Sequence, residues 1–337
     1  MKILKLGDLH IGVKQDDPWI QNIQMDGIKQ AIDYSKSKGI STWLQAGDWF
    51  DVRKAITHKT MNFNRKICEL IEDAGITVYV IVGNHDSTFK NTIFPNACDE
   101  LLSQFKNFNV INKVCTLEFD DVKIDMVPWI CDENQDEIME FIKNSNSKFC
   151  MGHFELNGFY FYKGMKSHGA EPDFLKAYKR VWSGHFHTIS ENRNVTFIGT
   201  PWSLTSGDEN DPRGFWEFDT ETEESIFVQN STMWHRRIDY PTSINPEVYR
   251  NLSVRVFVTK VDSKLAKFET DLEEVVHELK IVNRVDSSVE IVEDTSDEVK
   301  SMVDLIEEYI GALPDLSDGD SEAIKSISKA LYMEASK

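Results

Sequence analysis

The feature that most constrains the fold is a series of short apolar runs, each followed at once by glycine or by polar side chains. The runs read as buried strands and cover residues 2–6, 41–46, 77–82, 148–151 and 180–183. Helical patterns follow the first two runs, at Trp19–Lys38 before Gly39 and at Lys59–Ala74 before Gly75. This alternation predicts βαβ crossovers and a largely parallel core sheet, so the fold class is α/β. The later runs, from residue 122 to residue 229, are strand-rich and suit a second sheet packed on the first.

Each of the five runs ends in a motif whose side chains can bind metal ions. In order the motifs are Asp-Leu-His, Gly-Asp-Trp-Phe-Asp, Gly-Asn-His-Asp, Gly-His and Gly-His-Phe-His. Ligands of open α/β sheets bind at the carboxyl ends of the strands, so we expect the motifs to meet at one edge. A single motif could be a turn or a pair of surface histidines. The five together, in this order, favour a metal centre with the ligands Asp8, His10, Asp48, Asn84, His153, His185 and His187.

These oxygen and nitrogen donors suit two divalent ions about 3.5–4 Å apart. The expected ligands form two sets that share Asp48 as the bridging anion: Asp8, His10 and His187 for one ion, and Asn84, His153 and His185 for the other. The donor types favour manganese, with magnesium, iron or zinc as alternatives. Two such ions supply a nucleophilic hydroxide and neutralise charge on phosphorus, while His85 would assist the leaving oxygen as a general acid. The site chemistry therefore predicts a metal-dependent phosphoesterase.

Composition bears on the partner and on the compartment. The net charge of −19 is unusual for a nucleic-acid enzyme, since a basic surface is the ordinary signature of one. The excess is uneven, because 20 acidic and 9 basic side chains lie between Lys260 and the last residue. Five cysteines without a Cys-x-x-Cys pair indicate a reducing compartment. With neither a leader peptide nor a membrane-spanning run in the sequence, we expect a soluble, cytoplasmic protein.

The composition shifts along the chain predict four regions: residues 1–240, 241–286, 287–297 and 298–337. The second region has a strand pattern at 252–259, a helical pattern over Lys264–Leu279 and a return strand after it. The third is acidic and serine-rich, which is typical of a flexible linker. The fourth holds two amphipathic helices whose apolar stripes include Met302, Ile306, Ile310, Ile324, Ile327 and Leu331. These stripes could pack on the chain's own core, but the tether before them favours a partner surface.

The motifs resemble the pattern of the calcineurin-like metallophosphoesterase superfamily. Longer strings, among them FDVRKAITHKT, ELNGFYFYKGMKSHG, VWSGHFHTISE and GDENDPRGFW, resemble the SbcD-type nucleases of double-strand-break repair, including those of T-even phages. The resemblance implies a two-sheet α/β/β/α sandwich as the nuclease domain, a small α/β capping domain that touches DNA, and a C-terminal helical pair. It also implies a homodimer whose helical pair binds an SMC-like ABC-type ATPase. The protein would act as an exonuclease and an endonuclease. It would do so in the cytoplasm, which is the host cytoplasm if the protein is phage-encoded.

By the same resemblance, the seven candidate ligands and the catalytic His85 fall where the family pattern places them. One departure is Asp51, because many cellular relatives carry a histidine three positions after the bridging aspartate. The family's second catalytic histidine is therefore missing from this position.

Basic residues near the motifs are candidates for DNA contacts: Arg53, Lys54, Lys163, Lys166, Arg236 and Arg237. The segment 157–169 interleaves aromatic residues with lysines, a pattern typical of single-strand binding, although its aromatics could simply be buried. Solvated surface charge and packing between domains are the alternatives for the arginines.

Two other function classes remain at this stage. A small-substrate phosphatase or phosphodiesterase would use the same dimetal centre, but it would need neither the capping region nor the tethered helices. A non-catalytic scaffold would show decayed ligands, and all seven are present.

Overall fold

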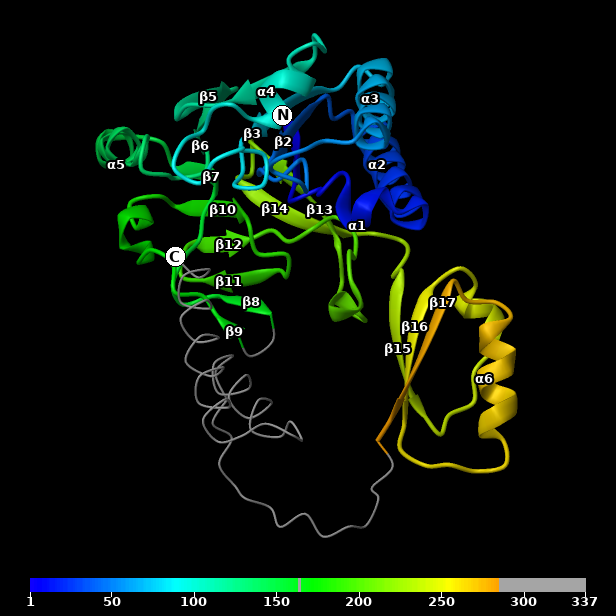
Figure 1. Ribbon diagram of the computed structural model, residues 1–337. Coiled ribbons are helices and arrows are strands. Elements are labelled where there is room, and N and C mark those ends of the chain that lie inside the picture. The colour runs from blue at the N-terminus through cyan, green and yellow to red at the C-terminus, as the bar shows by residue number, and fades with distance from the viewer. Residues whose placement is uncertain (163–164, 285–337) are drawn as a thin grey trace, which may run out of the picture. The chain divides into compact units, whose positions relative to one another are not determined.

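The computed structural model describes residues 1–162 and 165–284, with the side chains of 161–166 outside the description. Its core is a pair of six-stranded sheets (Figure 1). In spatial order the first sheet contains β14 (Glu224–Gln229), β13 (Gly214–Asp219), β1 (Lys2–Leu6), β2 (Thr42–Gln45), β3 (Thr77–Ile81) and β4 (Phe108–Ile111). The second contains β11 (Ser190–Asn192), β12 (Val195–Phe197), β10 (Arg180–Gly184), β7 (Phe149–His153), β6 (Val122–Val127) and β5 (Cys115–Phe119).

The inner strands of both sheets run parallel. β1 to β4 pair in parallel, as do β6, β7, β10 and β12, whereas β13, β14, β5 and β11 add antiparallel edges. The inner strands are buried on both faces, which explains why their sequences are continuous apolar runs. The prediction of a largely parallel α/β core is confirmed.

Helices cover the outer faces of the two sheets. They are α1 (Val13–Asp16), α2 (Pro18–Lys38), α3 (His58–Asp73) and α4 (Ala97–Leu102) on the first sheet, and α5 (Gln135–Asn144) with η1 (Pro172–Leu175) on the second. Between the sheets, a buried cluster that includes Leu44, Phe149 and Phe218 joins the two inner faces. These layers confirm the α/β/β/α sandwich. The remaining elements of this part are β8 (Tyr160–Tyr162), β9 (Met165–Lys166) and η2 (Ser206–Asp208).

The two helices that follow the first motifs begin and end as their sequences predict. The side chain of Asp17 accepts a hydrogen bond from the Trp19 amide at the start of α2, and Gly39 ends that helix in the left-handed conformation. Thr57 caps α3 in the same way, through the Thr60 amide. Local signals therefore fix the lengths of the crossover helices that set the strand order.

A separate three-stranded parallel sheet follows: β15 (His235–Tyr240), β16 (Ser253–Val258) and β17 (Glu278–Asn283), with η3 (Pro246–Tyr249) and α6 (Leu265–Glu273) in its crossovers. The helix predicted over Lys264–Leu279 is too long and has to be corrected. α6 ends at Glu273, and Leu279 pairs with Val254 in the sheet. β15 belongs to this sheet, although residues 235–240 fall within the range 1–240 that the composition assigned to the first region.

Some predictions fall outside the described residues: the acidic linker 287–297, the helices of 298–337 with their six stripe residues, and the side chains of Lys163 and Lys166. Among the described helices, none combines the length and apolar composition needed to cross a membrane. All five cysteines lie in the described part and are free thiols.

Candidate metal centre

Five strands deliver the candidate ligands to one edge of the sandwich. Asp8 and His10 follow β1, Asp48 follows β2, Asn84 follows β3, His153 ends β7, and His185 and His187 follow β10. The structure brings all seven side chains close to one another, with Asp8, His10 and His187 in one group and Asp48, Asn84, His153 and His185 in another.

The first group is built around His10. Its Nε2 lies 3.0 Å from Nε2 of His187 and 3.9 Å from Oδ2 of Asp48. Nε2 of His187 is 3.8 Å from Oδ2 of Asp8. Ligand atoms of Asp8, His10 and His187 all lie within 4.8 Å of one another. Such a convergence of nitrogen and oxygen donors is typical of a divalent cation site.

The second group is built around His153, which is fully buried. Its Nε2 lies 2.8 Å from Oδ1 of Asn84 and 3.3 Å from Oδ2 of Asp48. Nδ1 of His185 is 3.1 Å from the same Asn84 oxygen. Because Asp48 approaches both His10 and His153 through Oδ2, it occupies the bridging position between the two groups.

Three of the candidate ligands have strained backbone conformations. His10, Asp48 and His185 have φ values of 50°, 52° and 85°, in the left-handed region that such residues seldom adopt. Gly83 allows close packing here, since a Cβ at this position would lie 2.3 Å from Asp48 Oδ1. The surrounding structure therefore holds the ligands in conformations that the free chain would avoid.

In His153 and His10, the ring nitrogen opposite the inward Nε2 faces an oxygen atom. Nδ1 of His153 lies 2.8 Å from the carbonyl oxygen of Ala46. Nδ1 of His10 lies 3.0 Å from Oδ1 of Asp51. Both acceptors place the proton on Nδ1, which leaves Nε2 free to bind a metal. Asp51 thus supports a ligand from the position where many relatives have a histidine.

The ionisation of the group indicates a shortage of positive charge. Burial raises the pKa of Asp8 to about 7, with the His153 charge opposing the rise and the Asp48 charge adding to it. Burial would lower the pKa of His10 and of His153, but carboxylates raise these values to about 8 and about 9. Protons therefore compensate for the clustered carboxylates in the protein alone. Divalent cations would replace them, so the residues fit a dimetal centre.

The pKa values of the two remaining candidate ligands among the histidines, His185 and His187, also suit metal binding. Burial, helped by the charge on His153 or His10, lowers the pKa of His185 and of His187 to about 3. Both rings are neutral at pH 7, which is the form that binds a metal ion.

His85 lies beside the candidate ligands and forms a further group with His10 and Asp51, in which one possible ligand atom of each residue lies within 4.8 Å of the others. Its amide donates to Asp48 Oδ1 at 2.7 Å, and its Nδ1 lies 2.7 Å from the carbonyl oxygen of Asp51. A carbonyl only accepts, so Nδ1 carries a proton and Nε2 is the nitrogen available to a substrate. Asp86, the residue after His85, accepts hydrogen bonds from the amides of Gly83 and Phe50 and so joins two motif loops.

A network of buried polar groups extends from the ligands toward the three-stranded sheet. The Arg213 guanidinium donates to the carbonyl oxygen of His187 and to Oδ1 of Asp208, the second contact at 2.7 Å. The next residue, Glu209, has Oε1 2.6 Å from Nη2 of Arg255 on β16. Nearby, Trp19 stacks on His277 with ring centroids 4.4 Å apart and donates from Nε1 to the carbonyl of Asn251.

The candidate DNA contacts do not form one surface. Arg53 and Lys54 line a hollow on the loop after Asp51. Arg237 lies in a row of cations across the three-stranded sheet, where it is the register partner of Arg255, which in turn pairs with Lys280. Arg236 points to the opposite face, because successive residues of a strand alternate.

The row of cations includes residues that the sequence analysis missed. Arg237 and Arg284 each place their guanidinium carbon 4.2 Å from the Phe257 ring centroid. Trp129 and Glu155, next to His185, were also missed. Only the strand register could have revealed the row, since its members are far apart in the sequence.

Comparisons with known proteins agree with this geometry. The family model described as calcineurin-like phosphoesterase matches residues 1–188. The chain is 61% identical over 337 residues to exonuclease subunit 1 of Enterobacteria phage T4, covering 99% of each chain. It is 27% identical over 212 residues to the DNA double-strand break repair protein Mre11 of Sulfurisphaera tokodaii, covering 59% of this chain and 54% of that one. A solved archaeal phosphodiesterase covers 68% of the chain, and is itself fully covered, at 14% identity and a TM-score of 0.37, too weak to inform the argument.

Proposed function

This chain belongs to the calcineurin-like phosphoesterase family, and from that premise we propose that it is a divalent-metal-dependent DNA nuclease, the catalytic subunit of an ATPase–nuclease complex that processes DNA ends. The observation that carries the proposal is the pair of ligand groups that share Asp48, with His85 beside them. The names of the T4 and archaeal relatives, an exonuclease subunit and a break-repair protein, support DNA as the substrate.

The proposed ligands are Asp8, His10, Asp48, Asn84, His153, His185 and His187. When bound, two divalent ions, manganese by preference, supply the activated nucleophile and neutralise charge on phosphorus. His85 would then place its Nε2 at the leaving oxygen and protonate it, while the Asp51 carbonyl holds the ring. His85 is half-exposed, so a phosphodiester can reach it from solvent.

The cation row supports a DNA contact on the three-stranded sheet, whose strands β16 and β17 lie within the proposed capping domain 241–286. Lys280 and Arg284 are exposed and continue the row from Arg237 and Arg255. In a chain of net charge −19, four cations on one small sheet form a local surface that can hold phosphates. Two of these cations already have acidic partners: Arg237 pairs with Asp239, and Arg255 pairs with Glu209. The positive charge available to DNA is therefore greatest at Lys280 and Arg284.

The proposal includes a homodimer and an ATPase partner. Exposed apolar side chains at Val52, Met61, Phe89 and Phe94, with exposed fractions of 40–55%, support self-association. We assign the SMC-like ABC-type ATPase to the two amphipathic helices that the sequence predicts within 298–337, beyond the predicted linker 287–297. As a phage-type nuclease, the protein would act in the host cytoplasm.

The main experiment measures cleavage of end-labelled single- and double-stranded DNA in manganese by the wild type and by His85→Ala. We expect the variant to keep its metal affinity and to lose 10²- to 10⁴-fold in rate, the usual contribution of a general acid. An aryl phosphodiester is the control substrate. Turnover of the ester without any DNA cleavage would favour the alternative, a small-substrate phosphodiesterase.

A second experiment tests the partner assignment. Deleting residues 298–337 should abolish co-purification with the ATPase while leaving manganese-dependent cleavage by the free subunit intact. If the truncated chain still captured the ATPase, the docking assignment would be wrong.

A further inference from the structure

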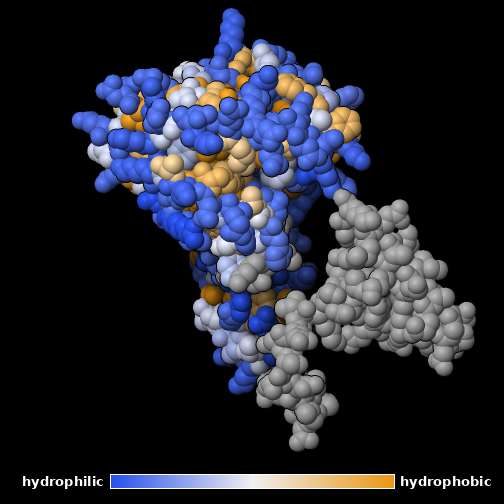
Figure 2. Space-filling model, turned by 90° about the vertical axis from the view of Figure 1, so that its left-hand side faces the viewer, coloured by the Kyte–Doolittle hydropathy of each residue, from blue (hydrophilic) through white to orange (hydrophobic). Residues whose placement is uncertain are grey.

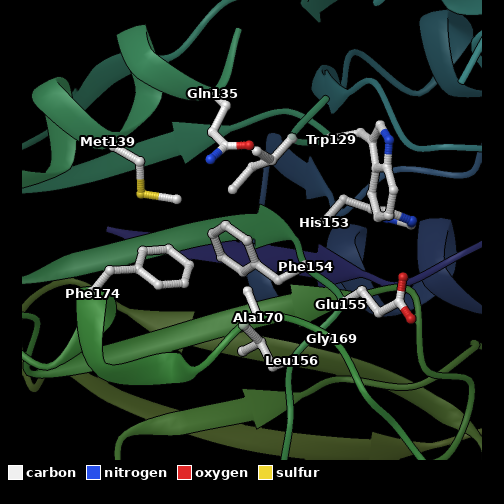
Figure 3. A pocket seen from close by; sticks show the side chains of 11 residues that line it. Trp129, Gln135, Met139, His153, Phe154, Glu155, Leu156, Gly169, Ala170 and Phe174 are labelled. Atoms are coloured by element: carbon white, nitrogen blue, oxygen red, sulfur yellow. The ribbon is translucent and has the colours of Figure 1, made fainter. Parts of the chain in front are cut away.

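A cavity of about 270 Å³ adjoins the metal centre, between the end of β7, α5 and η1 (Figure 3). His153, one of the proposed ligands, forms part of its wall. The ring of Trp129, also in the wall, lies 5.4 Å from the ring of His185. Glu155 lies at the same end, with Oε2 3.9 Å from Nε2 of His185. One end of the cavity is therefore next to His153 and His185 of the second ligand group.

The lining of this cavity is mainly aromatic and aliphatic. Figure 3 shows Met139 and Phe174 at the end away from the metal centre, and Trp129, His153 and Glu155 at the near end. Phe154 lies between them, with its ring centroid 5.9 Å from that of Phe174. The polar groups are few: the Gln135 amide, the Glu155 carboxylate and the His153 ring.

Such a lining selects a flat, largely apolar ring with a polar edge. A phosphate or a sugar would find too few hydrogen-bonding partners there, and buried polar groups without partners are costly. Drug-sized ligands occupy cavities of roughly 300–1,000 Å³, so one of about 270 Å³ suits a single small ring system. Figure 2, which views the molecule from the side that carries α5 in Figure 1, shows hydrophobic residues among hydrophilic ones on this face.

We infer that this cavity binds the nucleobase of a nucleotide adjoining the scissile phosphate, an inference that rests on the nuclease activity proposed above. One sugar joins a base to its phosphate, so a phosphate at the metal centre places that base next to Trp129 and His153. Proteins that bind single strands hold bases against aromatic side chains in this manner. The Gln135 amide offers a donor and an acceptor to the edge of the base.

A base can enter the cavity only after leaving the helical stack. Extrusion of a base is unfavourable in a duplex and least unfavourable in a single strand or at a frayed end. The cavity thus favours terminal or unpaired nucleotides. By holding one base, it would determine which phosphodiester bond lies at the metal centre.

The test is an abasic scan of a single-stranded oligonucleotide in manganese, using the full-length wild-type chain. A tetrahydrofuran abasic residue replaces one nucleotide at a time on either side of the cut. We expect kcat/KM to fall roughly ten-fold or more only when the abasic residue adjoins the cut, in line with the usual contribution of one stacked base. A flat profile at all positions would overturn the inference, and this arm needs no variant.

A cavity-filling variant provides the second arm. Ala170 is an exposed residue on the cavity wall, so Ala170→Trp fills the space without disturbing the core. The variant should lose the same factor on intact DNA and nothing further on the abasic oligonucleotide. Lys143→Trp, at an exposed position of α5 outside the cavity, is the matched control and should behave as wild type. An Ala170→Trp protein that cleaves intact DNA at the wild-type rate would contradict the assignment.

Failure of the underlying function would look different. If the wild type cut no oligonucleotide in manganese, the proposed nuclease activity would fall, and the nucleobase assignment with it. If the wild type cut DNA but showed no abasic effect, only the nucleobase assignment would be lost.

Discussion

Replacing Asp51 with asparagine should weaken metal binding without damaging the chemical step. The Asp51 carboxylate lies 3.0 Å from Nδ1 of His10, a proposed ligand, and its charge makes that ring a better donor to a cation. The substitution Asp51→Asn keeps the shape and an acceptor oxygen but removes the charge.

The magnitude can be bounded from this contact. Two full charges at 3.0 Å would interact by about 5 kcal/mol at an effective dielectric constant near 20. The imidazole bears only part of a charge, and Asp51 is 26% exposed, so the net effect is smaller. Loss of such an orienting partner typically costs 10- to 100-fold in metal affinity, or about 1.4–2.8 kcal/mol. We expect a loss in this range.

Calorimetric titration with manganese at pH 8 measures the loss directly, and Asp73→Asn at the exposed end of α3 is the matched control. At saturating manganese, kcat should stay near the wild-type value, because the main-chain oxygen of Asp51 still holds His85. Unchanged manganese affinity in Asp51→Asn would refute the orienting role. A collapse of kcat at saturating metal would instead place the carboxylate in the chemical step.

Three further predictions follow from burial and charge. Manganese affinity should rise with pH up to about 9, because a cation must displace the protons held by His10 and His153, whose pKa values are raised to about 8 and about 9; affinity independent of pH would contradict this. Lys5→Met should raise the Tm by a few degrees, since burial lowers the pKa of Lys5 well below its usual value. The gain in Tm should grow as the pH falls, because Lys5 of the unfolded wild-type chain binds a proton more readily than the buried Lys5 of the folded chain. If calorimetry showed a lower Tm for the variant, the favourable contact between Lys5 and the Trp182 ring would be the larger effect. Trp19→Ala should speed amide exchange in β16 and β17 by removing the stacking on His277, and unchanged exchange would exclude that contact as a tether.

The core of the fold and the set of candidate ligands could be predicted from the sequence because local signals determine both. β1 is buried on both faces, so its apolar run needed no tertiary information. The ligands follow such runs directly, and the glycines beside them mark close approaches, as at Gly83 against Asp48.

Other features depend on pairing that no local signal reveals. The residues after Glu273 fit helical and strand periods equally well, and pairing with β16 decides for the strand at Leu279. The role of Asp51 depends on which way its side chain points, toward His10 or toward solvent. Likewise, the cavity wall is assembled from β7, α5 and η1, whose contacts only the folded chain defines.

The contacts from the carbonyl oxygen of His187 through Arg213 and Asp208 to Glu209 and Arg255 connect the proposed metal centre to the three-stranded sheet, so that metal binding and DNA binding at that sheet would be thermodynamically linked. Coupling of this kind is reciprocal, because a change in one equilibrium alters the other by the same factor. A DNA phosphate that draws Arg255 away from Glu209 would break the last contact in the series that begins at the carbonyl oxygen of His187. The same linkage requires that filling the dimetal centre alter the affinity of the cation row for DNA. Each of the two binding events would then alter the affinity of the other through a path of five residues, without any direct contact between DNA at the sheet and the metal.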